Sequence, residues 1–371
     1  MKRKKAFISL VYIVVLLGGM LGSFLVSPST AWETLTGEEG SFGERVETAL
    51  KANLPLHEEL RSFKVSIKLL SGQKEIDNIF FVDHRLIENL TVQDETLADS
   101  NRRALQSFVQ KFPIVPSLML IPTACSIDQQ LLPSNAILFD QKGWLEKIDQ
   151  ELSQFCYPID AYSPLFASRE ESLFYRTDSR PTQLAGYKLY AALGDRLGFI
   201  PLPFSAFSIE PLAYGCYGNL YSRWNNGGVR ADTVTAYLPV SQDFSYRVTH
   251  QSPDGITATY YTLYPRQATV LGNDIDQILG GSSARIDIKS YGIAERRLLI
   301  VGDDYADCLV PYLALHYSDI TVINPTLCSK GMMEQLSDES YDQIFLAFST
   351  ASFLNMDLST PISYYLKAAE E

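Results

Sequence analysis

The sequence predicts an α/β protein in which a mostly parallel sheet carries helices on both faces, with a β-rich insertion. Two observations predict the sheet. Short apolar runs such as LLIVG and IFLAF are typical of strands buried on both faces, and they alternate with longer segments of helical periodicity. The insertion is predicted by a change in residue pattern and composition between residues 201 and 290, where helical periodicity disappears and Gly, Ser and Tyr are frequent.

The predicted elements follow in order along the chain. In the helix at 94–112, Leu97, Leu105 and Phe108 recur mostly at three- and four-residue spacing, and Gly198 ends the helix at 182–199. Residues 79–90 indicate a strand, a turn and a second strand. Further helices are expected at 46–72, 135–155 and 305–317, and further strands at 117–124, 318–326 and 341–350. A short strand and a loop are expected at 157–165, and a strand that ends in a turn at 296–304.

The N-terminal 32 residues predict a signal anchor that spans the membrane. An uncharged run of 21 residues, 6–26, follows a Lys/Arg cluster and is long enough to cross a bilayer as a helix. The cluster would stay in the cytoplasm and the body outside it. A cleaved signal peptide, with small residues Ser29 and Ala31 before the cut, is the alternative. Residues 33–45 are expected to form a linker, and 46–371 the extracytoplasmic domain.

Charge and cysteine content exclude several classes of function. The formal net charge is −12 even though the first five residues are strongly basic. Such an acidic body argues against nucleic acid as a partner. The five cysteines are scattered without a C-x-x-C pair, so we expect no metal site and no disulfide framework, but buried thiols. We expect no cofactor.

A candidate nucleophile position lies in the segment LLIVGDDYADCLVPYL. A buried strand, a tight Gly-Asp turn and a helix start would expose one side chain beside helix N–H groups. A serine hydrolase of the GDS type would place serine at position 304, where this chain has Asp304. The alternative is that Asp304, with Asp303 and Asp307 nearby, is only a helix N-cap.

A candidate base position lies in FYRTDSRPTQLAGYKLYAAL, at the carboxyl end of another expected strand. Asp178 is present, but Arg180 stands where a D-x-H motif would supply histidine. Arginine cannot act as a general base, because its guanidinium stays protonated. We therefore expect Arg180 to form a salt bridge with Asp178, Asp303 or Asp304. None of the four histidines is an obvious substitute, and we expect Cys308 to be buried in a helix.

Taken together, these motifs resemble those of the DHHW family of exported bacterial proteins, which are similar to SGNH-hydrolase-like alginate O-acetylation proteins. The resemblance covers about 50–353, and its landmarks occur in family order: NIFFVDHRLIEN, LMLIPTACSIDQQLLPSNAILFDQKGWLEKI, FYRTDSRPTQLAGYKLYAAL, ADTVTAYLP, ILGGSSARIDI and LLIVGDDYADCLVPYLALHYSDITVINP. The namesake segment is usually Y-x-T-D-H-H-W-T followed by G-A-Y. Here Asp178 matches the family Asp, whereas Ser179, Arg180 and Pro181 replace the two histidines and the tryptophan.

The resemblance implies an SGNH-like fold with a degenerate ester-handling site. Asp178, Arg180 and Asp304 match the family's Asp, His and Ser positions, and the last two are substituted. We expect Tyr175, Thr177, Ser179 and Asp303 to contribute to a binding cleft for a surface glycan or an envelope assembly protein. The expected role is accessory, in assembly or O-acetylation of cell-surface polysaccharide. The alternative is an active O-acyl esterase or acetyltransferase with a relocated catalytic set, such as another serine with His250.

Overall fold

The computed structural model describes residues 57–92, 94–240, 244–265, 275–336 and 339–369. The expected membrane anchor at 1–32 and linker at 33–45 lie outside this part of the chain. No helix within it is long and apolar enough to cross a membrane. The helix α4 (His57–Leu70) and the segment Trp224–Gly227 belong to one compact unit, in which the Asn226 amide donates to Ser62 O and to Ser66 Oγ. The other described residues form the second unit.

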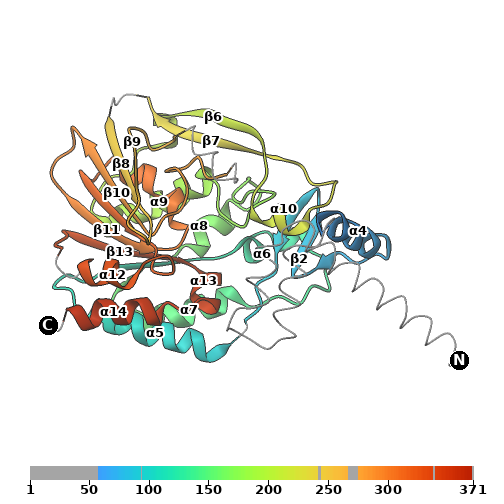
Figure 1. The fold of residues 1–371 in the computed structure, drawn as a ribbon, viewed down its shortest axis with the longest axis horizontal. Helices are drawn as coiled ribbons and strands as arrows, with labels where there is room; N and C mark the ends of the chain where they lie inside the picture. Colours follow the sequence, from blue (N-terminus) through green and yellow to red (C-terminus); the bar gives the residue numbers. More distant parts are fainter. Residues whose placement is uncertain (1–56, 93, 241–243, 266–274, 337–338, 370–371) are drawn as a thin grey trace, which may run out of the picture. The chain divides into compact units, whose positions relative to one another are not determined.

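An eight-stranded mixed sheet organises the second unit (Figure 1). Five strands form its parallel half: β5 (Tyr157–Pro158), β4 (Ser117–Ile121), β13 (Gln343–Ser349), β11 (Arg297–Gly302) and β12 (Asp319–Ile323). Three antiparallel strands continue from β12: β10 (Arg285–Tyr291), β8 (Ser245–Gln251) and β9 (Thr257–Tyr260). The parallel half confirms the strands expected from apolar runs, since these strands are buried on both faces.

Most strands of the β-rich segment join the main sheet. The strands β8, β9 and β10 extend it, and the register pairs Ile286 with Val322 of β12. Only β6 (Phe207–Cys216) and β7 (Asp232–Pro239) form a two-stranded ribbon of their own. The sequence could not predict this division, because strand pairing depends on partners far away in the chain rather than on local pattern.

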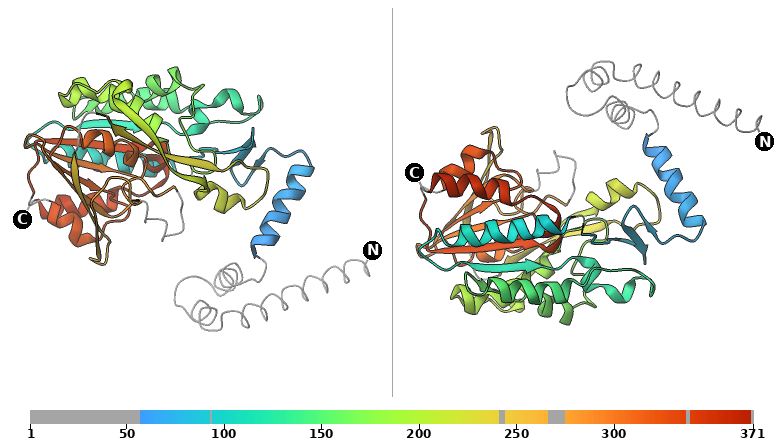
Figure 2. Two further views of the ribbon diagram at one scale, coloured as in Figure 1. Left: turned by 90° about the horizontal axis from the view of Figure 1, so that it is seen from above. Right: turned by 90° about the horizontal axis from the view of Figure 1, so that it is seen from below.

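Helices cover both faces of the sheet, as predicted (Figure 2). Alternate residues of each parallel strand point to opposite faces: Leu298 and Ile300 pack with α9 (Gln183–Leu197), whereas Leu299 and Val301 pack with the opposite group of helices. That group comprises α5 (Glu95–Val109), α7 (Gln141–Leu152), α12 (Lys330–Gln335), α13 (Thr350–Asn355) and α14 (Ser359–Ala368). Smaller helices are α6 (Ala124–Ile127), α8 (Tyr162–Ala167) and α10 (Asn219–Trp224).

Capping residues set the ends of the long helices. Asp94, Asp140 and Thr182 accept hydrogen bonds from backbone N–H groups in the first turns of α5, α7 and α9. Gly198 ends α9 in the left-handed conformation, with φ of 67°. The helix expected over 135–155 begins only at Gln141, since Asp140 caps it there.

The helix expected over 305–317 is much shorter than predicted. The chain makes a 3₁₀ turn at Ala306–Cys308 and then a single α-helical turn, α11 (Val310–Leu313). Pro311 lies near the start of α11, where it lacks the N–H that a continuous helix would need. Gly186 of α9 lies against this segment, and an added Cβ would collide with Cys308 O. Close contact between the two backbones is therefore possible only without a side chain at position 186.

The strand–turn–strand prediction over 79–90 is confirmed. Strands β2 (Ile79–Val82) and β3 (Arg85–Glu88) pair antiparallel and are joined by Asp83 and His84, both with positive φ. A short strand, β1 (Glu75–Ile76), completes this sheet.

The thiols of the chain behave largely as small apolar side chains. All five cysteines lie in the described residues and all are free; four are buried, as predicted, and Cys328 is half-buried. Burial raises the pKa of Cys308 and raises that of Cys156 to about 12. Neither thiol is activated as a nucleophile.

Candidate functional site

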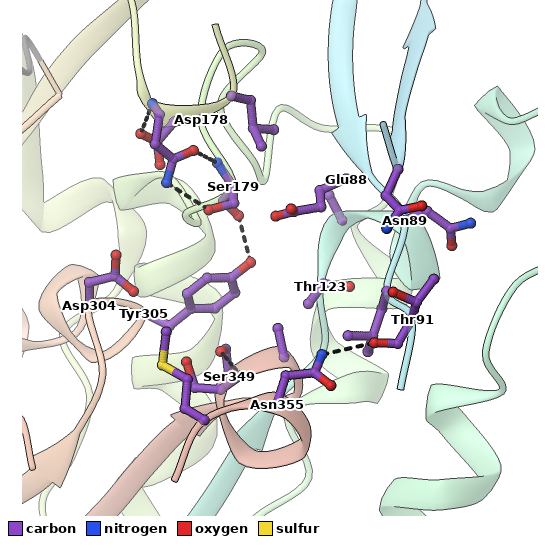
Figure 3. Close-up of a pocket in the computed structure, with 18 of the residues that line it drawn as sticks. Glu88, Asn89, Thr91, Thr123, Asp178, Ser179, Asp304, Tyr305, Ser349 and Asn355 are labelled. Carbon is purple, nitrogen blue, oxygen red and sulfur yellow. Dashed lines mark hydrogen bonds between the residues drawn. The ribbon is translucent and has the colours of Figure 1, made fainter. Parts of the chain in front are cut away.

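A pocket of about 480 Å³ lies where the strands β4, β11 and β13 end (Figure 3). We call it the site pocket. Its position follows from the fold, because loops that leave the carboxyl ends of parallel strands meet at one edge of the sheet. Its polar lining comprises Asn78, Glu88, Asn89, Thr91, Thr123, Asp178, Ser179, Asn219, Arg223, Asp304, Ser349, Ser352 and Asn355.

Asp178 and Arg180 form a buried, two-pronged ion pair beside the pocket. Arg180 Nε lies 2.8 Å from Asp178 Oδ1, and Arg180 Nη2 lies 3.0 Å from Oδ2. The Arg180 backbone N–H also donates to Oδ1. Only 1% of Asp178 and 9% of Arg180 is exposed. The salt bridge predicted between these two side chains is therefore confirmed, and both oxygens of Asp178 are occupied.

Arg180 also has a third acidic neighbour, which the sequence did not indicate. Its Nη1 lies 2.5 Å from Oδ1 of Asp276, and its Nε lies 4.0 Å from Oδ2 of Asp304. One guanidinium thus lies within 4.0 Å of three carboxylates. Burial by itself raises the pKa of Asp178, but the charge of Arg180 and the hydrogen bonds outweigh it, and the pKa lies below its ordinary value. Asp178 is consequently ionised at neutral pH.

The first residue of α10, Asn219, supplies the remaining hydrogen-bond partner of Asp178. The Asn219 backbone N–H donates to Asp178 Oδ2 at 2.9 Å, while the Asn219 side chain accepts from Ser179 N and donates to Ser179 Oγ. Gly218 permits this close approach, since an added Cβ would lie 2.7 Å from Asp178 Cγ. The serine at the first lost histidine position is thereby tied to Asn219.

Asp303 is a structural carboxylate underneath the pocket. It is 5% exposed and accepts hydrogen bonds from the backbone and side chain of Ser349, at the end of β13, and from Tyr305 N. Burial raises the pKa of Asp303, and the hydrogen bonds from Ser349 oppose this shift. Asp303 therefore joins the ends of β11 and β13.

Asp304 points toward the pocket and keeps 37% of its side chain exposed. It is not the N-cap of a helix: the 3₁₀ turn after it has Tyr305 at its N-cap and no side-chain capping bond. Burial of the carboxyl and the nearby charge of Asp303 raise the pKa of Asp304 to about 7, although Arg180 opposes this shift. Near neutral pH, Asp304 is therefore partly protonated.

Not every predicted site residue reaches the pocket. Asp178, Ser179 and Asp304 line it, as Figure 3 shows, so both substituted motifs meet in one place. Tyr175 and Thr177 are buried and do not line it. Thr177 instead donates to Asp232, which holds the approach to Asp178 in place.

The described histidines all lie outside the site pocket. The ring of His250 bonds Leu279 O at 2.7 Å and packs edge-on to Tyr260. His316 bonds the Tyr190 hydroxyl, and His84 bonds Gly228 O. Burial lowers the pKa of His316 to about 4. The side chain of His57 is outside the described part.

No group of three or more His, Cys, Asp or Glu side chains within the described ranges is arranged to hold a metal ion. The carboxylates around Arg180 use their oxygens on that guanidinium and on backbone donors instead.

Several residues that line the site pocket were not predicted from the sequence. Glu88 at the end of β3 pairs with Arg223 of α10, and Asn355 of α13 donates to Thr91 O at 2.9 Å. These residues come from separate parts of the chain; Glu88 lies in the landmark NIFFVDHRLIEN, whereas Arg223 and Asn355 belong to no motif. Only the fold brings them together, and nothing in the local sequence indicates it.

Solved structures of other proteins share this architecture. No protein-family model and no curated protein matches the chain. Among solved structures, a DHHW family protein from Eubacterium siraeum superposes with a TM-score of 0.63 at 17% identity, covering 77% of this chain and 94% of that one. PatB1 from Bacillus cereus does so with a TM-score of 0.63 at 15% identity, covering 76% and 98%; a second PatB1 structure carries a sulfonyl adduct.

The O-acetyltransferase domain of Pseudomonas putida AlgJ is more distant, with a TM-score of 0.47 at 15% identity, covering 78% of this chain and 99% of that domain. At these identities the comparisons define the fold. The predicted resemblance is thus confirmed at that level: the chain is a DHHW-like protein in its α/β fold.

Proposed function

We propose that the chain is a membrane-anchored, extracytoplasmic protein whose DHHW-like site no longer handles esters and instead binds glycan. Its role would be accessory, in the assembly or O-acetylation of a cell-surface polysaccharide. The observation that carries this proposal is the ion pair between Asp178 and Arg180, which occupies the Asp and His positions of the family motif.

The ion pair argues against acid–base catalysis. In a Ser-His-Asp arrangement the carboxylate orients a histidine that takes the serine proton. Here both oxygens of Asp178 bind Arg180, whose guanidinium stays protonated and cannot take a proton. The described histidines are engaged elsewhere.

The residue at position 304 also argues against catalysis. Asp304 has no hydroxyl to acylate and lies close to Arg180, Asp303 and other carboxylates. Ser179, the nearest serine of the motif, donates its backbone N–H to Asn219 and accepts a hydrogen bond at its hydroxyl. Neither side chain has a described histidine beside it that could take a proton.

The pocket itself is well suited to an uncharged glycan. Its amides and hydroxyls, including those of Asn78, Thr91 and Asn355, can both donate to and accept from sugar hydroxyls. Asp178, Asp304 and Glu88 outnumber the lining cation Arg223, and the chain carries a net charge of −12. This charge disfavours polyanionic polymers.

Catalytic degeneracy is tested by restoring the family residues. The full-length chain, purified in mild detergent, is offered p-nitrophenyl acetate and a sulfonyl fluoride. We expect the wild type to hydrolyse the ester no faster than Asp178→Asn. The double variant Arg180→His/Asp304→Ser is the matched comparison, and only it should be labelled by the sulfonyl fluoride. Wild-type turnover that Asp178→Asn abolishes would overturn the proposal.

Glycan binding is tested with a panel of two-unit and six-unit oligomers. The panel contains N-acetylglucosamine, glucose and galactose oligomers, with galacturonate oligomers as anionic comparison. We expect at least one uncharged series to bind and Arg223→Trp, which places an indole in the pocket, to abolish binding. Arg196→Trp on α9, outside the pocket, should bind as the wild type does. A protein that binds no member of the panel would be a scaffold without ligand.

A further inference from the structure

A second pocket, of about 370 Å³, lies between α5, α7 and the end of α13, elements that are close together in Figure 1. We call it the Trp144 pocket. Its lining combines partly exposed aromatic rings with charged side chains and includes none of the residues that match the family's Asp, His and Ser positions. The proposed function above does not use it.

Two aromatic rings give the Trp144 pocket an apolar surface. Trp144 and Phe139 line it and are both half-buried. The Trp144 ring is 6.4 Å from that of Phe139 and 5.6 Å from that of Phe353, so its position is fixed by packing. A fixed, partly exposed indole offers a flat apolar surface on which the C–H face of a sugar ring can pack, at little cost in side-chain entropy.

The charged side chains of this pocket balance one another. Arg102 Nε lies 3.3 Å from Glu151 and 3.6 Å from Asp99, and Lys147 Nζ lies 3.9 Å from Glu151. Two cations thus face two anions, and the pocket has no net charge to attract an ion. Paired donors and acceptors beside an apolar surface fit an uncharged, hydroxyl-rich ligand.

The two pockets share one wall. Thr91 lines the site pocket and the next residue, Val92, lines the Trp144 pocket; in the same way Leu354 lines the Trp144 pocket and Asn355 the site pocket. The hydrogen bond from Asn355 to Thr91 O ties the two sides of this wall together (Figure 3). The two pockets therefore adjoin at the segments around Thr91 and Asn355.

We propose that both pockets bind one uncharged polysaccharide chain, with some sugar units in the site pocket and further units on Trp144. This inference rests on the proposed function and extends it, since it makes the ligand a polymer rather than a single sugar or a terminal unit. Once one part of the polymer is bound in the site pocket, binding of further units on Trp144 is intramolecular. We therefore expect affinity to increase with chain length.

The test measures how affinity depends on chain length, using the full-length protein and the uncharged oligomers named above. We expect six-unit oligomers of at least one series to bind about tenfold more tightly than two-unit oligomers. Trp144→Ala should reduce this difference to about twofold or less and leave two-unit binding unchanged. Arg102→Ala, which spares the aromatic packing, should weaken six-unit binding in the same selective way. Tyr261→Ala removes an exposed aromatic side chain elsewhere and should have no effect.

The outcomes separate the two proposals. Equal affinity for two-unit and six-unit oligomers would overturn the extended site while leaving the site pocket as a glycan site. Equal losses for short and long oligomers in both Trp144→Ala and Arg102→Ala would also overturn it. The absence of binding to any oligomer would instead overturn the proposed function, and this inference with it.

Discussion

Arg180 shows how one substitution changes the chemistry of a site while preserving its architecture. It stands two residues after Asp178, where the family motif has histidine, and engages Asp178 through both carboxylate oxygens. The sequence predicted Asp178 as one of three possible partners, with Asp303 and Asp304, and the structure shows that Arg180 pairs with Asp178. The sequence could not predict Asp276, the other strong partner of Arg180, because that contact depends on the fold.

Removal of Arg180 should destabilise the protein strongly. Arg180→Ala leaves Asp178 buried without its counter-charge, and losing one partner of a buried ion pair costs roughly 3–5 kcal/mol. Urea unfolding measures the change in the free energy of unfolding. The control is Arg223→Ala, which breaks the exposed pair with Glu88 and should cost about 1 kcal/mol or less. Similar losses in the two variants would contradict the buried-pair interpretation.

The buried Asp307 should make stability depend on pH. Burial and the charge of Asp304 raise its pKa from 3.8 to about 8, although a hydrogen bond from Ser282 and the charge of Arg180 oppose this; Asp276 adds to the rise. Between these two values the folded protein keeps a proton that the unfolded chain has lost. Asp307 therefore makes the free energy of unfolding fall as pH rises through this window.

Asp307→Asn removes this titration. Relative to the wild type, the variant should gain stability as pH rises from 5.5 to 8.5, measured by urea unfolding at each pH. Asp254→Asn is the control, because the pKa of this exposed carboxyl lies below 3.8 and its titration is complete before pH 5.5. An Asp307→Asn variant with the same pH slope as the wild type would show that Asp307 is already ionised in the folded protein.

Single elements differ in how well their sequence predicts them. The strands β4, β11, β12 and β13 are recognisable because each is an apolar run buried on both faces. The segment after Asp304 has helical composition but makes only short turns, since it packs closely against Gly186 of α9. Here a tertiary contact overrides local propensity.

The loop between β6 and α10 should depend on Gly218. In Gly218→Ala the new Cβ would collide with the Asp178 side chain, and the Asn219 N–H would be displaced from Oδ2. We expect a loss of about 1–3 kcal/mol, together with weaker binding of the uncharged oligomers. Thermal unfolding and oligomer titration measure the two effects.

Gly331→Ala is the matched control for that substitution. Gly331 lies in α12 with no atom within 4 Å of an added Cβ, so alanine should be neutral or stabilise by up to about 1 kcal/mol. If Gly218→Ala is as well tolerated as Gly331→Ala, the loop is not held as closely to Asp178 as the structure indicates.

At the scale of the whole molecule, the fold was predictable and the complete site was not. Alternating elements and motifs in family order were enough to predict the α/β architecture and to bring Asp178 and Asp304 to one pocket. Glu88, Arg223 and Asn355 complete the lining from other elements, and Trp144 lies in an adjoining pocket. Such neighbours are set by packing between distant segments, which local patterns do not encode.

The N-terminal residues should decide where this acidic body is located. As a helix, the run of 21 uncharged residues would be about 30 Å long, which matches the hydrocarbon core of a bilayer, and the preceding basic cluster favours the cytoplasmic side. We expect the full-length chain, tagged at its C-terminus, to sediment with membranes and to resist alkaline extraction. The tagged body should be digested by protease added to spheroplasts.

A matched variant separates an anchor from other causes of sedimentation. Leu16→Arg/Leu17→Arg places two charges at the centre of the run, each costing about 2.5–3.5 kcal/mol on insertion, and should shift the protein to the soluble cytoplasmic fraction. N-terminal sequencing of the wild type distinguishes the remaining possibility. An intact N-terminus in the membrane fraction supports an anchor, whereas a new N-terminus shortly after Ala31 on soluble, exported protein would show that the segment is a cleaved signal peptide.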